Sequence, residues 1–191
     1  MKRSLGSLGL PAPSPVWVIG TYDSSGAPNL MTAAWAGICC SKPPAVGVSL
    51  REATYTYGNI VGRKAFTVNV PSAPQAKTAD YLGIASGRDG DKFAAAGLTA
   101  VKGRLVDAPS VAEFPLSIEC RLLHTLKIGL HTLFVGEIAD VQAEDSVLVE
   151  GHPTLDRLAP FLFSAGEQAY YAVGPRIGPA FQIGRELLRS E

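Results

Sequence analysis

The chain has 191 residues, 47% of them hydrophobic, and its 17 basic residues balance its 17 acidic ones. This length and composition allow a substantial buried core and exclude an intrinsically disordered protein. Because the charges cancel, no global basic field attracts nucleic acid or an anionic membrane, and any anion site must be local. We therefore expect neither nucleic acid nor a membrane among the partners.

Residues 1–12 predict an irregular N-terminal arm. The start Met1-Lys2-Arg3 is similar to that of a signal peptide, but glycines and prolines interrupt the next residues, so no apolar segment of adequate length forms. No run of residues approaches the length of a membrane span. We expect a cytoplasmic protein.

The first half of the chain predicts strands separated by turns. Apolar runs at 16–22 and 29–40 flank a turn that contains Gly26, and a further strand is expected at 45–50. A helix is expected at 54–63 and a strand at 65–70. Two N-terminal caps fit this helix: Ser49 with Glu52 in capping-box spacing, or Thr54.

The second half predicts longer strands with short helices between them. Helices are expected at 75–82, 90–96, 154–158 and 182–189, and strands at 99–106, 116–127 and 131–143, the last two joined by a tight turn at Gly129-Leu130. Apolar and polar residues alternate over 117–124, which is typical of a half-buried strand. Strands joined by short turns favour a mainly β, antiparallel barrel over a doubly wound sheet. Without a repeat or a linker, residues 1–191 form one expected domain.

The three cysteines are Cys39, Cys40 and Cys120. An odd count without regular spacing argues against a disulfide framework and against a zinc site. A vicinal redox pair at 39–40 is the less favoured alternative. We interpret all three as small buried residues of strands.

The segment 29–35 suggests a wall for a flat ligand. Small side chains at Ala33 and Ala34 leave room for a ring against the backbone, Thr32 offers a hydroxyl, and Asn29 offers both a donor and an acceptor. Trp35 is expected in the core. The alternative is a strand whose alanines only allow close packing of its neighbours.

The segment 49–56 suggests a phosphate site. A helix N-terminus exposes backbone N–H groups and a partial positive charge. Arg51 adds a fork of donors that matches phosphate, and Thr54 and Thr56 add hydroxyls. Helix capping alone explains the same residues, so this motif by itself is weakly specific.

Two further features complete the candidates. The segment 86–93 mixes glycines with charges; it is either a solvated turn or an ordered loop over a site, with Lys92 as a second positive charge. His131 is the one histidine we consider for function, because it comes directly after the hairpin turn. No dinucleotide-binding glycine motif, phosphate loop, nucleophile elbow or metal-ligand spacing is found.

In their order along the chain, these motifs resemble the flavin reductase-like domain family, and within it the flavoredoxin branch. The resemblance spans about residues 13–178 and rests on Asn29-Leu30-Met31-Thr32, Pro43-Pro44, Ser49-x-Arg51, Thr54-Tyr55, Phe66-x-Val68-Asn69-Val70-Pro71, Ser86-Gly87-Arg88-Asp89-x-Asp91-Lys92-Phe93, His131-Thr132-Leu133-Phe134-Val135-Gly136-Glu137 and Tyr170-Tyr171-x-Val173-Gly174.

The resemblance implies a Greek-key split β-barrel that binds FMN in a groove at or near the interface of a homodimer. It implies that the isoalloxazine and ribityl region is lined by Asn29, Met31, Thr32, Ala33 and Ala34. The ring edge, ribityl chain and phosphate would be held by Ser49, Leu50, Arg51, Thr54 and Thr56. The resemblance also implies that Lys92 and Phe93 close the site and that His131 lies near flavin and nicotinamide. The family often carries a polar residue before this histidine, whereas Leu130 stands here.

The resemblance implies an oxidoreductase in which NADH or NADPH reduces FMN, and FMN then reduces a flavin or another acceptor. The flavin carries the hydride chemistry, so the protein only has to orient the ring, tune it and control access. Without a dinucleotide fold, the nicotinamide must stack transiently on the exposed flavin face. Two alternatives stay open: an electron carrier reduced by a partner protein, and a barrel that binds flavin without catalysis.

Overall fold

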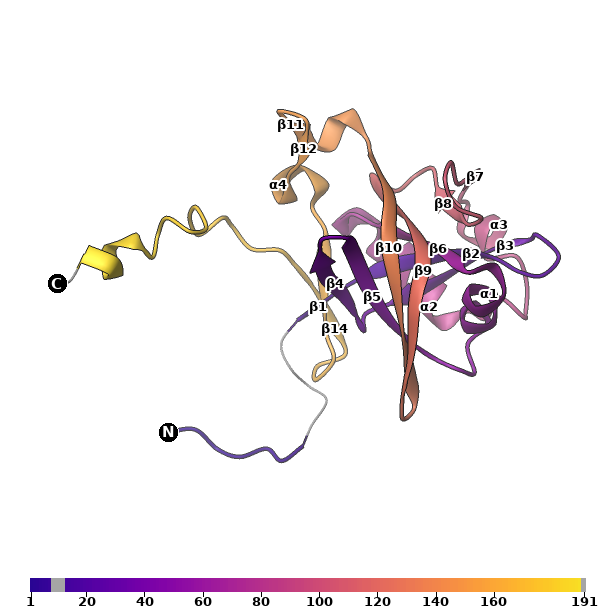
Figure 1. Cartoon of the computed structure of the whole chain (residues 1–191), viewed down its shortest axis with the longest axis horizontal. Coiled ribbons are helices and arrows are strands. Elements are labelled where there is room, and N and C mark those ends of the chain that lie inside the picture. Colours follow the sequence, from indigo (N-terminus) through magenta and orange to yellow (C-terminus); the bar gives the residue numbers. More distant parts are fainter. Residues whose placement is uncertain (8–12, 190–191) are drawn as a thin grey trace.

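Seven antiparallel strands form the central sheet in the part of the chain that the computed structural model describes, residues 1–7 and 13–189 (Figure 1). Their order is β3-β2-β6-β9-β10-β5-β4. Their bounds are Trp17–Tyr22 (β2), Pro28–Ala33 (β3), Ala36–Ser41 (β4), Pro44–Arg51 (β5), Ala65–Val70 (β6), Leu116–Ile128 (β9) and His131–Ala143 (β10).

The sheet curls because its two edge strands, β3 and β4, are consecutive in the chain. Only Ala34 and Trp35 separate them, and the amide of Ser49 in β5 donates to the carbonyl of Trp35 at 2.8 Å. The enclosed face carries the main core, with Ile19, Phe66 and Phe134 fully buried. The predicted mainly β, antiparallel barrel is therefore confirmed.

Smaller strands flank the barrel. A three-stranded sheet contains β1 (Ser14–Pro15), β13 (Phe161–Ser164) and β14 (Ala169–Ala172). Two short hairpins pair β7 (Ala100–Lys102) with β8 (Pro109–Val111), and β11 (Leu148–Val149) with β12 (His152–Pro153). Aromatic residues of the first of these sheets line one side of a cavity.

The helices are short: α1 (Tyr55–Arg63), α2 (Ala76–Ile84), α3 (Lys92–Ala96), α4 (Leu155–Leu158) and three 3₁₀ turns at Ala73–Gln75, Asp145–Val147 and Arg185–Arg189. Helices α2 and α3 pack on β3, where Leu30, Leu82 and Phe93 belong to a second core. Of the two caps considered for α1, Thr54 is the right one, because its side chain accepts from the amide of Tyr57. Ser49 lies instead within β5.

Two strand predictions need correction. The run 29–40 is two strands rather than one, because the chain turns at 34–35 to pass from one edge of the sheet to the other. The run 99–106 keeps strand structure only to Lys102. Beyond it, the amides of Arg104, Leu105 and Val106 bind the carboxylate of Glu119 instead of a neighbouring strand.

The alternation in β9 does not predict burial at every position. It places Glu119 on a solvated face, yet this side chain is only 1% exposed, because residues 104–106 cover that face. Arg121, two residues on, is exposed as the pattern predicts.

The prediction for the cysteines is right for one of three. Cys120 is buried in the core, and burial raises the pKa of its thiol to about 12. Cys39 and Cys40 are exposed, contrary to expectation. They lie on β4, an edge strand of the sheet, where few neighbours cover the side chains. All three are free thiols.

Both ends of the chain extend from the barrel (Figure 1). Residues 1–7 form no helix or strand, as expected for an arm, and residues 8–12 of the predicted arm lie outside the described residues. In the described parts of the chain, every helix is too short or too polar to cross a membrane.

Candidate functional site

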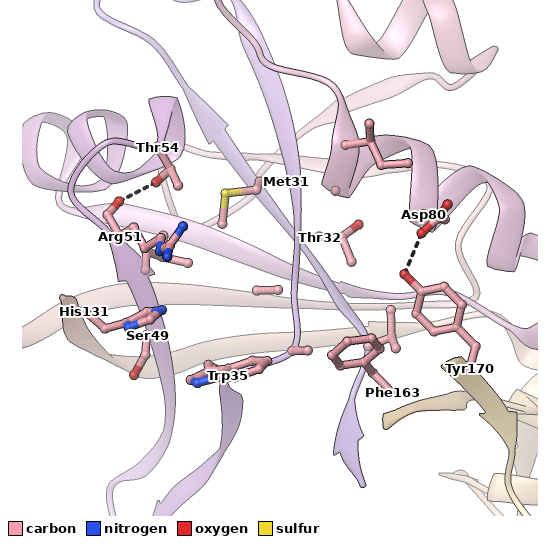
Figure 2. A pocket seen from close by; sticks show the side chains of 16 residues that line it. Met31, Thr32, Trp35, Ser49, Arg51, Thr54, Asp80, His131, Phe163 and Tyr170 are labelled. Atoms are coloured by element: carbon pink, nitrogen blue, oxygen red, sulfur yellow. Dashed lines mark hydrogen bonds between the residues drawn. The ribbon is translucent and has the colours of Figure 1, made fainter. Parts of the chain in front are cut away.

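A cavity of about 400 Å³ opens beside the break between β3 and β4 (Figure 2). Strands β3, β5 and β10 supply one side, and helix α2 with β13 and β14 supplies the other. Its volume falls in the range of small-molecule and cofactor sites. It is lined by Val16, Met31, Thr32, Ala33, Ala34, Trp35, Ser49, Leu50, Arg51, Thr54, Asp80, Gly83, Ile84, His131, Phe163 and Tyr170.

Trp35 belongs to this cavity, so its expected place in the core is wrong. Its side chain is 47% exposed and stacks on His131, with ring centroids 6.3 Å apart and planes inclined by 6°. The error comes from treating 29–40 as one strand, since the turn at 34–35 moves the indole out of the alternation. Phe163 adds a tilted ring 6.4 Å from Trp35, so aromatic faces form one wall.

Arg51 and Thr54 bring positive charge and donors to one end of the cavity. Between them a tight turn forms, in which the amide and the hydroxyl of Thr54 both donate to the carbonyl of Arg51, at 3.0 and 2.9 Å. Helix α1 starts immediately afterwards, so its N-terminal N–H groups add partial positive charge. This end can hold an anion.

A second cavity of about 190 Å³ adjoins the first and shares Met31, Thr54, Gly83 and Ile84 with it. It is also lined by Asn29, Ala53, Tyr55, Thr56, Ala85, Ser86, Gly87, Arg88 and Lys92. The two cavities together therefore bring the 29–35, 49–56 and 86–93 segments to one place. These are the three segments that the sequence singled out.

Asn29 leaves one buried hydrogen-bonding atom open in this second cavity. Its Nδ2 donates to the hydroxyl of Thr56 at 3.0 Å, but its Oδ1 is buried and has no partner among the described residues. Gly87 keeps the space beside this oxygen free, because a Cβ there would lie 2.1 Å from Oδ1. A buried acceptor without a partner is costly unless a ligand or an ordered water supplies a donor.

Lys92 also lines this second cavity. The Nζ donates to the carbonyls of Leu82 and Ala85 at 2.7 and 2.8 Å, which leaves one of its three N–H bonds available. Burial lowers the pKa of Lys92 to about 8, so the side chain remains mostly charged at neutral pH. Arg88 is a third cation here, with Nη1 donating to the carbonyl of Ala53 at 3.0 Å.

The structure brings most predicted site residues together. Met31, Thr32, Ala33, Ala34, Ser49, Leu50, Arg51, Thr54 and His131 line the first cavity, and Asn29, Thr56 and Lys92 line the second. The hydroxyl of Thr32 donates to the carbonyl of Ala79. The prediction that Phe93 closes the site is wrong, because this residue lines neither cavity. It stands in the first turn of α3 and packs in the second core, to which Leu30 and Leu82 also belong.

Three residues that sequence reasoning missed lie on the far side of the first cavity. Tyr170 and Phe163 come from β14 and β13, and Asp80 comes from α2. The hydroxyl of Tyr170 donates to Oδ1 of Asp80 at 2.8 Å, and burial together with this contact raises the pKa of Tyr170 to about 12. Tyr170 stands in a motif of the resemblance, whereas nothing local distinguishes Asp80 from other surface acids.

The described residues contain no group of three or more His, Cys, Asp or Glu side chains that could hold a metal ion. The donors and acceptors at the two cavities instead suit an organic ligand that carries an anionic group.

A family model described as the flavin reductase like domain matches residues 9–168. The chain belongs to this family. Flavoredoxin of Desulfovibrio vulgaris (Miyazaki F) is 50% identical, with a TM-score of 0.92 over 96% of this chain and 100% of that one. Flavoredoxin from Methanosarcina acetivorans is 30% identical, with a TM-score of 0.92 over 98% and 100%. These similarities confirm the flavoredoxin branch.

A more distant solved structure also has this fold. The FMN-binding protein from Thermus thermophilus, solved with bound 1-cyclohex-2-enone, is 25% identical, with a TM-score of 0.79 over 94% of this chain and 99% of that one. The split-barrel architecture expected from the motifs is thus confirmed.

Proposed function

We propose that this protein is an FMN-binding oxidoreductase that uses NADH or NADPH to reduce a flavin or another acceptor. The observation that carries the proposal is the unpaired acceptor Asn29 Oδ1, at a cavity that the cation of Lys92 also lines. The flavin ring presents an N–H between two carbonyl groups, which is the complementary pattern. The similarity to proteins named for FMN and to flavoredoxins supports the same ligand.

The residues of the two cavities divide the tasks of holding FMN. Arg51 and Thr54, at the start of α1, would bind the phosphate, because a guanidinium and a helix N-terminus both favour an anion. Asn29 and Lys92 would bind the polar edge of the ring. Bound FMN would supply the hydride chemistry. The chain itself would orient the ring and, through Trp35 and His131, limit access to it.

An electron carrier reduced by a partner protein is the second candidate. Leu130 favours it, because this side chain stands at the tip of the β9–β10 hairpin, next to His131, and is exposed. Where members of the family often carry a polar residue, leucine offers a nicotinamide nucleotide no side-chain hydrogen bond. The relatives named flavoredoxin add support.

The visible spectrum of the purified protein tests these candidates. We expect a yellow protein, or one that takes up added FMN, whose absorbance bleaches within seconds of adding NADH or NADPH without oxygen. Bleaching only with dithionite or with a protein reductant would support the carrier instead. A colourless protein that does not take up FMN would refute both proposals.

We further propose that two copies of the chain associate. Residues that pair between neighbouring strands lie on the same face of a sheet, and His131 pairs with Arg51 on β5 and with Ile128 on β9. The cavity wall therefore continues into Leu126 and Ile128, each 56% exposed. A second copy covering this apolar face would also cover the open side of the site. A solution mass of one chain at micromolar concentration would contradict the proposal.

A further inference from the structure

Asp80 and Tyr170 mark one end of the first cavity, opposite Arg51 and Thr54 (Figure 2). Asp80 comes from α2 and Tyr170 from β14, and the Tyr170 hydroxyl donates to Asp80 Oδ1 at 2.8 Å. The ring of Tyr170 is held in place by Phe161 and Phe163, whose centroids lie 5.4 and 5.7 Å away. These contacts therefore hold the two side chains in fixed positions.

Toward the cavity, this pair can accept hydrogen bonds but cannot donate them. Tyr170 has a single hydroxyl proton, and Asp80 receives it. What remains toward the cavity is the phenolic oxygen and the second carboxylate oxygen, and both are acceptors. Among the described residues, Asp80 forms no salt bridge, so no direct ion pair occupies its carboxylate.

The walls next to the pair suit a flat ring. The ring centroids of Trp35 and Phe163 lie 6.4 Å apart on one side, and Met31 and Thr32 of β3 line the space across from them (Figure 2). Aromatic walls with a few convergent polar groups are typical of sites that orient a planar ligand. A ring placed here would direct its substituents toward Asp80 and Tyr170.

The occupant of this end is a second molecule rather than FMN, provided that the proposed function holds. The acceptor Asn29 Oδ1 and the cation of Lys92 match the polar edge of the flavin, and both lie in the second cavity. That assignment leaves the end between Trp35, Phe163 and Tyr170 for the molecule that exchanges electrons with the flavin.

We propose that Asp80 and Tyr170 form an acceptor-only subsite, which binds the N–H-bearing edge of a flat second substrate and rejects a carboxylate at the same position. The carboxamide of a nicotinamide ring has the required chemistry, since it offers two N–H donors. A ring with a carboxylate in its place offers only acceptors and a second negative charge, which leaves both partners without a donor.

The test compares nicotinamide with nicotinate, two rings that differ in this one substituent. Each is titrated at pH 7.5 into the FMN-loaded protein, and binding is read from the flavin absorbance and fluorescence. We expect the wild type to favour nicotinamide by about tenfold or more, and Asp80→Asn, which supplies a donor and removes the charge, to reduce this preference to less than about threefold. Tyr170→Phe should reduce it less, because Asp80 stays charged.

Asp89→Asn is the matched control, because it removes the same charge from an exposed residue that lines neither cavity. An unchanged preference in Asp80→Asn, or no saturable binding of either ring to the wild type, would overturn the subsite. So would a loss of FMN affinity of more than about tenfold in Asp80→Asn and Tyr170→Phe, because the pair would then belong to the cofactor pocket. A wild type that does not bind FMN fails at the loading step, which identifies failure of the proposed function itself.

Discussion

Two buried polar clusters in this protein differ in whether their atoms all find partners. Around Glu119, both carboxylate oxygens accept bonds, from the amides of residues 104–106 and from the Nε2 of Gln142 at 2.8 Å. Around Asn29, the Oδ1 is buried without a partner among the described residues, and Lys92 retains a spare donor. The first cluster is complete within the chain, whereas the second keeps an acceptor and a donor that no described residue satisfies.

The comparison shows why buried polar groups do not all indicate function. A carboxylate that accepts several N–H bonds holds a loop against the sheet, and its removal damages the fold. A cluster with an unpaired acceptor lowers the stability of the folded chain until a donor binds to it. Variants in the two clusters should therefore separate stability from ligand binding.

The largest expected effect is on stability, from Glu119→Gln. Glutamine keeps the size but replaces one acceptor oxygen with an amide group that faces backbone N–H donors. We expect the free energy of unfolding to fall by about 3 kcal/mol. Urea denaturation measures this change. FMN affinity per folded molecule should stay within about twofold, and a strong loss of affinity at unchanged stability would contradict the division between the two clusters.

The next effect is on FMN binding, from Arg51→Ala. Loss of a charge-assisted contact of about 2 kcal/mol should weaken FMN binding about 30-fold and leave riboflavin binding nearly unchanged, because riboflavin has no phosphate. Fluorescence titration with both ligands measures the difference. Arg88→Ala is the comparison variant, since Arg88 is the other arginine of the adjoining cavities. If Arg88→Ala shows the phosphate-specific loss instead, Arg51 is not the phosphate ligand.

Gly87→Ala should fill the space beside the unpaired Oδ1 of Asn29. Its methyl group would lie 2.1 Å from Asn29 Oδ1, so the loop and the asparagine must shift, and FMN affinity should fall about tenfold. Gly58→Ala is the matched control, because nothing lies within 4 Å of a Cβ there. Equal FMN affinity in the two variants, measured by fluorescence titration, would show that the space beside Asn29 is not used by the ligand.

The smallest effect concerns pH. Because burial lowers the pKa of Lys92 to about 8, the charged form dominates at pH 7 and is largely lost at pH 9. We expect FMN affinity, measured by fluorescence titration, to fall about fivefold as the pH rises over this interval, since a cation near the ligand disappears. In Lys92→Met the affinity should be lower at pH 7 and should not change with pH. A pH dependence that survives in Lys92→Met would assign the titration to another group.

The sequence was sufficient to predict those parts of the fold that local patterns encode. Thr54 caps the N-terminus of helix α1, which was one of the two caps predicted from the sequence. The β9–β10 hairpin turns at Gly129, whose φ is +52°. The site residues on segments 29–34 and 49–56 were found because small residues, hydroxyls and an arginine stand close together in the chain. In these segments, neighbours in sequence are neighbours in space.

The errors occurred where a distant segment decides the environment. Trp35 lies outside the core because the chain crosses there from one edge of the sheet to the other, and Glu119 is buried by a loop about 15 residues away. Cys39 and Cys40 are exposed because β4 lies at an edge of the sheet. Burial depends on which segments cover a residue, and alternation along one strand does not report that.

The sequence by itself determined the barrel class, the family and the three segments that make the site, because each depends on residue types at short or ordered spacings. Only the tertiary structure placed Asp80 beside Tyr170, 90 positions apart in the chain, and left Asn29 Oδ1 without a partner among the described residues. Contacts between distant segments and the completeness of hydrogen bonding are properties of the packed chain. The unpaired acceptor distinguishes the second cavity from the completed polar cluster around Glu119.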